Sequence, residues 1–163
     1  MTETLIRPAE DRDQEALGRY GAALLRQHHA ADPRRFISAE HPEGAYGRFL
    51  VSQIANPDSV VLVADRSGDV VGYVWADLEG TSWRDLRGPC GFIQDVYVDP
   101  AARGGGIGRE LLEAAIAWIR SKGMRQVVLM HKTGNEAAQR LFAHVGFRDT
   151  MVEMTLDLEV PAR

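Results

Sequence analysis

The sequence predicts a mixed α/β fold, and three patterns carry this prediction. Stretches rich in β-branched residues alternate with stretches in which apolar residues recur at helical spacing. Two strand-like stretches, Ser59–Ala64 and Val70–Leu78, are separated by only a short glycine-containing turn, as in a β-hairpin. A glycine-dense segment, 104–108, connects another predicted strand to a long predicted helix. We therefore expect a single domain over residues 1–163, with helices packed on a sheet.

The composition is that of an ordinary folded protein. Of the 163 residues, 45% are hydrophobic and 26% are charged, which suits one sizeable core and excludes a disordered, collagen-like or coiled-coil chain. The net charge of −4 argues against a nucleic-acid partner, because non-specific binding to nucleic acid depends on Lys and Arg neutralising phosphates. Only the glycine content is unusual, with 16 glycines among 163 residues. Where these glycines lie matters more than their number.

The first part of the chain is expected to form one strand and two helices before the hairpin. Thr4–Arg7 has the pattern of a short strand that Pro8 ends. Asp11–Ala30 carries an apolar stripe at helical spacing, and a second stripe after a proline-containing loop predicts a helix that ends near Asn56. The stripe residues are Leu17, Tyr20, Leu24 and Leu25 in the first helix and Tyr46, Phe49, Leu50 and Ile54 in the second.

The second part of the chain alternates between predicted strands and helices. Gly91–Val98 is a predicted strand, and the glycine-dense segment after it leads into a helix that Gly123 ends. Gln126–His131 is expected to be a strand, Asn135–Val145 a helix and Thr150–Leu158 a final strand.

The start of the helix after Gly91–Val98 has the properties of an anion site. Backbone N–H groups at a helix N-terminus have no partner within the helix, and the helix dipole gives that end a partial positive charge. Glycines let a ligand approach the backbone closely, and Arg103 just before them can bond a phosphate. The segment lacks the residues of a P-loop and of a dinucleotide fingerprint. What remains is Arg-x-x-Gly-x-Gly at Arg103, Gly106 and Gly108, which alone also fits an ordinary strand-to-helix turn.

Cysteine use and the absence of targeting patterns indicate a soluble, cytoplasmic protein. Cys90 is the only cysteine, so no intrachain disulfide can form, and we expect it to be a small core residue rather than a nucleophile. The N-terminus lacks the pattern of a signal peptide. The longest apolar run, Val60–Ala64, is far shorter than the ~20 residues of a membrane helix. We expect no membrane partner and, because no His, Cys and carboxylate spacing fits one, no metal.

The loop from Arg103 to Gly108 resembles the coenzyme A pyrophosphate loop of the GNAT superfamily of N-acetyltransferases. The order of predicted elements also resembles that family over nearly the whole chain. Further residues match the family's strand ending before the loop and its N-x-x-A-x-x-L-Y-x-x-x-G-F pattern after it. They are Val96-Tyr97-Val98-Asp99-Pro100, and then Asn135, Ala138, Leu141, Phe142 and Gly146-Phe147. The resemblance implies an acyl-CoA N-acyltransferase fold: a mostly antiparallel sheet of six to seven strands, about four helices, and two strands that splay apart at the cofactor site.

The resemblance also implies acetyl-CoA as cosubstrate and a set of residues that contact it. The fourth strand would pair with the pantetheine arm through exposed backbone, and one N–H would polarise the acetyl carbonyl. The glycine loop would hold the pyrophosphate, and the next helix would border the cofactor from the other side. These residues are Val96, Tyr97 and Val98 for the arm, Arg103, Gly104, Gly105, Gly106, Ile107, Gly108 and Arg109 for the pyrophosphate, and Asn135, Ala138 and Phe142 for the border. Asn135 equally fits an ordinary helix N-cap.

Two positions depart from the family pattern and bear on catalysis. Phe142 stands where relatives often have a Tyr that protonates the departing thiolate, so the general acid is unassigned and Phe142 fits core or pantetheine packing. Gln94 stands where some relatives have a Glu as general base, and Gln cannot accept a proton. Asp95 is the nearest carboxylate and the candidate base, although strand alternation points it to the other face unless a bulge intervenes. A structural hydrogen-bonding role for Asp95 is the alternative.

The resemblance places acceptor specificity in the two N-terminal helices, the loop between them and the region of the third strand. Carboxylates and aromatic residues in these parts would suit a cationic amine, although surface carboxylates are mostly solvated and strand aromatics mostly lie in the core. They are His28, His29, Phe36, Glu40, His41, Glu43, Tyr73, Trp75, Asp77, Glu79, Trp83 and Asp85.

The implied function is transfer of the acetyl group of acetyl-CoA to a primary amine by direct attack in a ternary complex. A base must remove one proton, and proximity and carbonyl polarisation supply most of the remaining rate enhancement. Because position 94 is not Glu and position 142 is not Tyr, a non-catalytic acyl-CoA-binding or sensor module is the alternative. The acceptor, a small-molecule or peptide amine, the acyl preference beyond acetyl and the oligomeric state stay open, with a homodimer common among relatives.

Overall fold

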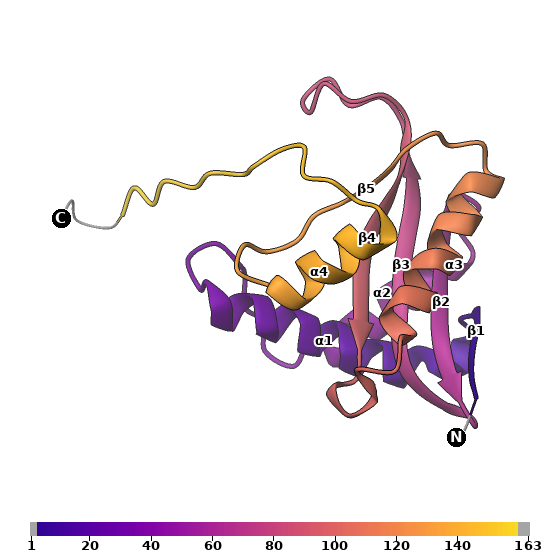
Figure 1. The fold of residues 1–163 in the computed structure, drawn as a ribbon. Helices are drawn as coiled ribbons and strands as arrows, with labels where there is room; N and C mark the ends of the chain where they lie inside the picture. Colours follow the sequence, from indigo (N-terminus) through magenta and orange to yellow (C-terminus); the bar gives the residue numbers. More distant parts are fainter. Residues whose placement is uncertain (1–2, 160–163) are drawn as a thin grey trace.

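The computed structural model describes residues 3–159 and contains one five-stranded sheet in that part of the chain (Figure 1). The strands lie in sequence order, and every neighbouring pair is antiparallel except the last, which is parallel. They are β1 (Thr4–Pro8), β2 (Ser59–Arg66), β3 (Asp69–Glu79), β4 (Cys90–Val98) and β5 (Val127–Leu129). The predicted mixed α/β architecture with a mostly antiparallel sheet is confirmed.

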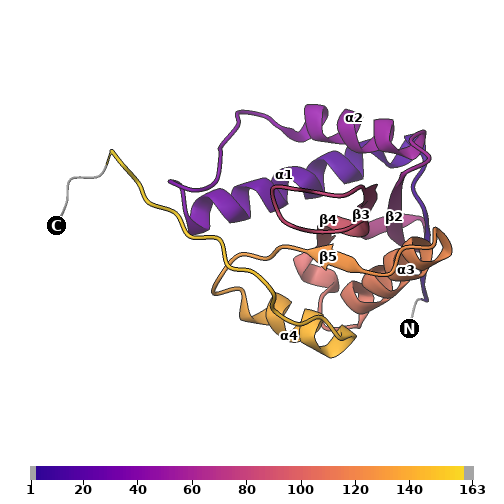
Figure 2. The ribbon, with the colours of Figure 1, turned by 90° about the horizontal axis from the view of Figure 1, so that it is seen from above.

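In the part of the chain that the structure describes, four α-helices cover the two faces of this sheet (Figure 2). Helices α1 (Gln14–Ala31) and α2 (Glu43–Ile54) pack on one face, and α3 (Ile107–Ser121) and α4 (Glu136–Val145) pack on the other. Short 3₁₀ turns, η1 (Asp11–Asp13) and η2 (Pro100–Ala102), precede α1 and follow β4. The helices therefore begin and end within a few residues of the positions that the apolar stripes and glycines predict.

The expectation of six to seven strands is wrong for the described residues. Thr150–Leu158 is extended but pairs with no strand of the described chain, and of the predicted strand Gln126–His131 only Val127–Leu129 is paired. The alternating pattern of Thr150–Leu158 remains that of a strand. A strand, however, exists only when a neighbour supplies hydrogen-bond partners, and no sequence pattern specifies that neighbour.

Each face of the sheet has its own apolar core. Below α3 and α4, the strands contribute small and branched residues, and the α3 stripe Ile107, Leu111, Leu112, Ala115 and Ile119 is at most 3% exposed. Below α1 and α2, the fully buried Tyr73 packs with the residues Leu17, Tyr20, Leu50, Val61 and Val63. The two cores hold β3 and β4 rigidly from both sides.

Helices α1 and α2 approach each other backbone to backbone. A Cβ atom at Gly18 would lie 2.2 Å from the carbonyl oxygen of Glu43, and one at Gly47 would lie 2.5 Å from that of Gln14. Only glycine fits these two positions. The close contact brings the neighbouring Tyr46 of α2 down onto the sheet, where it reaches β4.

Candidate functional site

The loop between β4 and α3 turns at two glycines with left-handed backbone. Asp99 caps η2 by accepting a hydrogen bond from the N–H of Ala101 at 2.8 Å. Gly104 and Gly106 then have φ angles of +86° and +87°, a region that strains L side chains. The loop is exposed from Arg103 to Gly106, and α3 begins directly after it. The first backbone N–H groups of α3 therefore face an accessible, glycine-lined surface.

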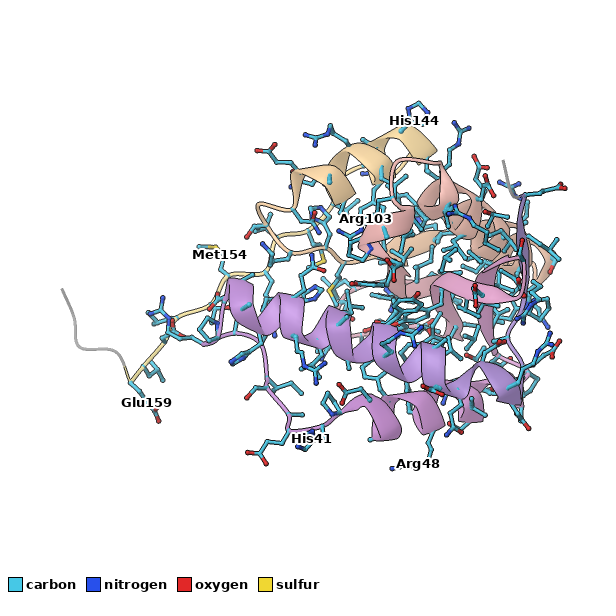
Figure 3. The ribbon with its side chains drawn as sticks, turned by 90° about the horizontal axis from the view of Figure 1, so that it is seen from below. His41, Arg48, Arg103, His144, Met154 and Glu159 are labelled. Atoms are coloured by element: carbon cyan, nitrogen blue, oxygen red, sulfur yellow. The ribbon has the colours of Figure 1, made fainter. Side chains whose placement is uncertain are left out.

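Two arginines flank this loop, and each already has partners. The Nε of Arg103 donates to the carbonyl oxygen of Val98 at 3.0 Å, and its guanidinium lies 5.4 Å from the centre of the Tyr97 ring. The Nε of Arg109 donates to Glu113 at 2.7 Å. Figure 3 labels Arg103 and also His144, the residue of α4 whose ring nitrogen lies 3.1 Å from Arg109. Both guanidinium groups are exposed and can turn toward an anion at the loop.

Two of the predicted loop residues have packing roles in the structure. Ile107 is 3% exposed and belongs to the core under α3, so only its backbone faces the loop. A Cβ atom on Gly108 would lie 3.2 Å from a methyl group of Leu141. Gly108 thus allows α3 and α4 to approach each other, which the motif alone did not indicate.

β4 pairs with all three residues of the short β5, but only near its own start. The register joins Gly91, Phe92 and Ile93 of β4 to Val127–Leu129 of β5, and no pairing continues beyond them in the described chain. The N–H of Asp99 donates to β3, and backbone groups alternate in direction along a strand, so the N–H and C=O groups of Val96 and Val98 point toward the opening. Within the described chain, the N–H groups of Val96 and Val98 and the C=O of Val96 are therefore free, whereas the C=O of Val98 accepts from Arg103 and the backbone of the predicted Tyr97 faces β3.

The α4 side of the opening has a capped helix and a buried ring. The Oδ1 of Asn135 accepts the N–H of Ala138 at 3.2 Å, so Asn135 is the N-cap of α4. Phe142 is 7% exposed and belongs to the core. Its ring lies 5.9 Å from that of His131, centre to centre. Sequence reasoning missed His131 as a neighbour of Phe142, because only the fold brings the residues after β5 beside α4.

A β-bulge in β4 decides which way Asp95 points. Trp75 pairs with Asp95, whereas the next residue of β3 pairs with Ile93, so Gln94 is an extra residue. Side chains on either side of such a bulge face the same side of the sheet. Gln94 and Asp95 therefore both face α1 and α2, and the exception allowed for a bulge applies instead of simple alternation.

Asp95 is held by two tyrosine hydroxyls from different elements. The hydroxyl of Tyr46 in α2 donates to Oδ2 at 2.7 Å, and that of Tyr73 in β3 donates to the same oxygen at 3.0 Å. Within residues 3–159, Oδ1 of Asp95 accepts no hydrogen bond, and no fully buried side-chain oxygen lacks a hydrogen-bond partner. Oδ1 therefore keeps contact with solvent. The hydrogen-bonding role expected for Asp95 is present, and one oxygen remains free for chemistry.

Burial controls the protonation of this cluster. Burial raises the pKa of Asp95 above its ordinary value, although the two tyrosine hydrogen bonds oppose the shift. Burial and the nearby carboxylate raise the pKa values of Tyr46 and Tyr73, so both hydroxyls keep their protons. Asp95 is thus a carboxylate with increased proton affinity and fixed orientation.

Gln94 bridges two carboxylates of β3. Its Nε2 donates to Asp77 at 3.1 Å and to Glu79 at 3.3 Å. Glu79 also pairs with Arg87. Burial raises the pKa of Asp77. Position 94 thus carries an amide in place of a possible proton acceptor. This amide links Asp77 and Glu79, two of the acidic residues predicted on the acceptor side. 

The remaining acceptor-side candidates do not converge on one groove. Glu43 pairs with Arg26 at 2.5 Å, and Asp85 accepts from Ser82 at 2.8 Å. The rest are dispersed over helix ends, the β2–β3 surface and loops. His28 and His29 bond backbone carbonyls, Phe36 packs on His28, Trp75 donates to Ser59, and Glu40, His41 and Trp83 are exposed. Of the predicted acceptor residues, Tyr73 and Trp75 lie beside Asp95, and Asp77 and Glu79 lie beside Gln94.

Other features of the described chain bear on the sequence predictions. Cys90 is fully buried, so its core assignment is confirmed, and burial raises the pKa of its thiol. Residues 3–159 contain no group of three or more potential metal ligands. No helix in this part is long and apolar enough to cross a membrane. A surface hollow of about 440 Å³ near Arg12 and Arg19 contains none of the predicted site residues.

The sequence profile of the Acetyltransferase (GNAT) family matches residues 21–147. The chain belongs to the GNAT family. Mycothiol acetyltransferase from Thermobispora bispora is similar to it, with 38% identity over 92 residues that make up 56% of this chain and 31% of that protein. The chain thus spans about a third of the length of that relative. Family and relative support an acyltransferase enzyme, as the resemblance implied.

Solved structures share the GNAT fold. A tetramutant of a Bacillus halodurans protein superposes with a TM-score of 0.81 at 27% identity, covering 94% of this chain and 99% of that one. An aminoglycoside N-acetyltransferase in complex with CoA superposes with a TM-score of 0.76 at 17% identity, covering 98% and 97%. At that identity the second likeness shows the fold alone; the CoA belongs to that neighbour's own structure.

Proposed function

We propose that this chain is an N-acetyltransferase that transfers the acetyl group of acetyl-CoA to a primary amine by direct attack in a ternary complex. The divergence of β4 from β5, directly before the left-handed glycine loop, carries the proposal. It leaves unpaired strand backbone beside a helix N-terminus, which suits an extended amide-containing arm joined to a pyrophosphate. The family membership supports the same chemistry.

The cofactor contacts follow from this arrangement. The free backbone groups of Val96 and Val98 pair with the amides of the pantetheine arm, and one N–H polarises the acetyl carbonyl. The loop from Gly104 to Gly108 offers backbone N–H groups to the pyrophosphate. Arg103 and Arg109 exchange their present partners for phosphate oxygens.

Asp95 is the proposed general base, acting at Oδ1 through a water molecule. The neutral amine attacks the thioester carbonyl, the C–S bond breaks, and the proton released by the nitrogen passes through water to Oδ1. The raised pKa of Asp95 increases its affinity for that proton. Tyr46 and Tyr73 position the carboxylate by holding Oδ2.

The thiolate of CoA needs a proton that Phe142 cannot supply. His131 is the proposed donor, because its ring lies against Phe142 at the edge of the opening and its side chain is partly exposed. Its Nδ1 lies 3.2 Å from the carbonyl oxygen of Lys132, which leaves Nε2 directed away from the backbone. Nε2 lies 3.9 Å from a carboxylate oxygen of the exposed Asp149.

The acceptor is proposed to be a cationic small-molecule or peptide amine. Asp77 and Glu79 lie beside Gln94 on the same face as Asp95, and carboxylates attract the ammonium form of an amine before it loses its proton. Related proteins are named mycothiol acetyltransferase and aminoglycoside N-acetyltransferase.

The test is an acetyl-transfer screen that measures release of free CoA with a panel of small amines, amino acids and peptides. We expect turnover with at least one cationic amine. Calorimetry with acetyl-CoA tests the site itself: Arg103→Ala and Gly106→Glu should each weaken binding at least tenfold. Unchanged affinity in both variants contradicts the assigned cofactor site. Tight binding without turnover for any amine contradicts catalysis and supports a sensor module.

A further inference from the structure

Asp99 is the fixed point from which the glycine loop starts. Its Oδ1 accepts the N–H of Ala101 at 2.8 Å, and its backbone oxygen accepts the N–H of Ala102 at 2.8 Å. Its own N–H donates to the carbonyl oxygen of Val71 in β3 at 2.9 Å. The residues that follow, 103–106, are exposed. The direction in which the chain leaves β4 is therefore set at Asp99.

The second carboxylate oxygen of Asp99 is held by a side chain of α1. The hydroxyl of Tyr20 donates to Oδ2 of Asp99 at 3.1 Å and to the carbonyl oxygen of Val70 at 2.9 Å, so its one proton is shared between two acceptors. Among the described residues, no other side chain from another element forms a hydrogen bond to residues 99–106. One hydroxyl thus connects α1 to the start of the loop.

The ring of Tyr20 also reaches toward the loop arginine. Its centre lies 5.5 Å from the centre of the Tyr97 ring. The guanidinium of Arg103, the loop residue labelled in Figure 3, lies 5.4 Å from the centre of that same Tyr97 ring. A cation over an aromatic ring is attracted by the electrons of the ring face. Tyr97 therefore supports Arg103, and Tyr20 supports Tyr97.

Packing alone does not require a hydroxyl at position 20. Tyr20 is 4% exposed and packs in the core with Leu17 and Leu50, where a Phe ring would fill nearly the same space. A buried hydroxyl must have hydrogen-bond partners, because an unpaired polar group in a core is costly. The partners of this hydroxyl are the residue that caps η2 and a carbonyl of β3. Its specific effect is therefore on the loop.

The conformation of the loop before binding affects how tightly it binds an anion. Glycine backbone has wide conformational freedom, and Gly104 and Gly106 both take left-handed angles here. A ligand that must first order its binding loop loses affinity by the cost of that ordering. A loop whose start is already fixed loses less affinity in this way.

We propose that Tyr20 is a positioning residue for the acetyl-CoA site proposed above, on which this role depends. Through Asp99 it holds the glycine loop in the conformation that binds the pyrophosphate, and it does not touch the cofactor. It acts on cofactor affinity and not on the chemical step, because Asp95 and its two tyrosine partners form a separate cluster. Helix α1, expected to serve the acceptor, thus also contributes to cofactor binding.

Tyr20→Phe tests this role because it keeps the ring and removes only the hydroxyl. We expect the Kd of acetyl-CoA in calorimetry, and its KM in steady-state rates, to rise about fivefold or more. The kcat value and the KM of the amine should stay within about twofold, since only cofactor binding is weakened. In the free protein, hydrogen exchange at the amides of Ala101 and Ala102 should become about threefold faster or more.

Ser59→Ala is the matched control, because it also removes a buried, hydrogen-bonded hydroxyl. Ser59 is 7% exposed, and its hydroxyl donates to the carbonyl oxygen of Ala76 at 3.3 Å, away from the loop. This variant should lose stability as Tyr20→Phe does, but keep the loop exchange and the acetyl-CoA affinity of the wild type. A double-mutant cycle with Asp99→Ala tests the route. Once the Asp99 side chain is absent, Tyr20→Phe should change the Kd by less than about twofold.

The variants also separate a failure of the Tyr20 role from a failure of the cofactor site. Unchanged affinity and exchange in Tyr20→Phe, with weaker binding in Arg103→Ala, overturns the role of Tyr20 and leaves the cofactor site in place. Unchanged affinity in both Arg103→Ala and Gly106→Glu removes the cofactor site, and the role of Tyr20 with it. Equal weakening in Tyr20→Phe and Ser59→Ala assigns the effect to general stability and contradicts positioning. Independent effects of Tyr20→Phe and Asp99→Ala contradict the route through Asp99.

Discussion

At the scale of single residues, the cluster around Asp95 combines an energetic cost with a chemical use. Removing a carboxylate from water is unfavourable, and the hydroxyls of Tyr46 and Tyr73 offset part of that cost at one oxygen. The remaining cost raises the proton affinity of the group. A base that is both buried and oriented accepts a proton more readily than a solvated Asp, so structural and catalytic roles for Asp95 are compatible.

Asp95→Asn is expected to lower kcat by about a hundredfold or more, because general base catalysis contributes at least that much. In the wild type, kcat should rise with pH through the raised pKa of Asp95, and this limb should disappear in the variant. Acetyl-CoA affinity should stay within twofold. Steady-state rates from pH 5 to 9 provide the measurement, with Asp77→Asn as the matched control that keeps the limb. An unchanged profile in Asp95→Asn would show that the base lies elsewhere.

Substitutions at Gly106 and Gly105 distinguish the effect of backbone strain on stability from the effect of ligand contact on binding. Gly106→Ala places a Cβ at φ +87° and should lower stability by about 1 kcal/mol. Gly105→Ala meets open space and should leave stability unchanged. Chemical denaturation measures this difference. Both substitutions narrow the approach to the loop backbone, so calorimetry should show weaker acetyl-CoA binding in both. Normal binding by Gly105→Ala would place the pyrophosphate away from this residue.

At the scale of elements, periodicity predicted nearly every helix and strand but not the contacts that set their partners. The apolar residues from Ile107 to Ile119 recur at helical spacing, and the structure forms helix α3 there with this stripe buried. No glycine or proline near Gln94 indicates the bulge in the sequence. The one extra residue of β4 relative to β3 becomes visible only when the two strands pair. The anion-loop geometry was predictable from its glycines, whereas Tyr46, Tyr73 and His131 reach the site through tertiary packing alone.

Gly91 tests how closely α3 packs on β4. A Cβ at this position would lie 2.2 Å from Ile119, so Gly91→Ala should lower the free energy of unfolding by about 2 kcal/mol through overpacking. Ile119→Ala removes the obstructing atoms. The double variant should therefore be less destabilised than the sum of the two single variants, by about 1 kcal/mol or more. Urea denaturation of all four proteins measures this coupling, and strict additivity would rule out the contact.

At the scale of the whole molecule, one buried ion-pair network fastens the start of the chain to the sheet. Arg7 of β1 contacts Asp13 before α1 at 2.7 Å and Asp65 of β2 at 2.9 Å, and the Asp13 side chain is only 5% exposed. Burial opposes ionisation of Asp13, but hydrogen bonds from Arg7 and from the N–H of Glu10 hold its pKa below the ordinary value. β1, α1 and β2 are joined through this network.

Asp13→Asn should lower stability at pH 7 by about 2 kcal/mol, less than the 3–5 kcal/mol typical of a broken buried pair, because Asp65 still neutralises Arg7. A lowered pKa in the folded state means that the contribution is present above the unfolded value of about 3.9 and is lost as pH falls through the folded value. The gap between wild type and variant should therefore close below pH 4 in urea titrations. Asp11→Asn, an exposed change in the same turn, is the control. A gap that stays constant as the pH falls well below the ordinary Asp value would assign it to packing instead of charge.

Because of the bulge in β4, either of two neighbouring positions, 94 or 95, can place a carboxylate on the same side of the sheet. Because Gln94 and Asp95 face the same side of the sheet, an amide and a carboxylate stand next to each other there. Exchanging them, as Gln94→Glu with Asp95→Asn, would relocate the proton acceptor by one residue at constant net charge. Such a relocation requires two point substitutions and no rebuilding of the sheet, so sequences of this architecture can differ in the position of their base while keeping the same backbone.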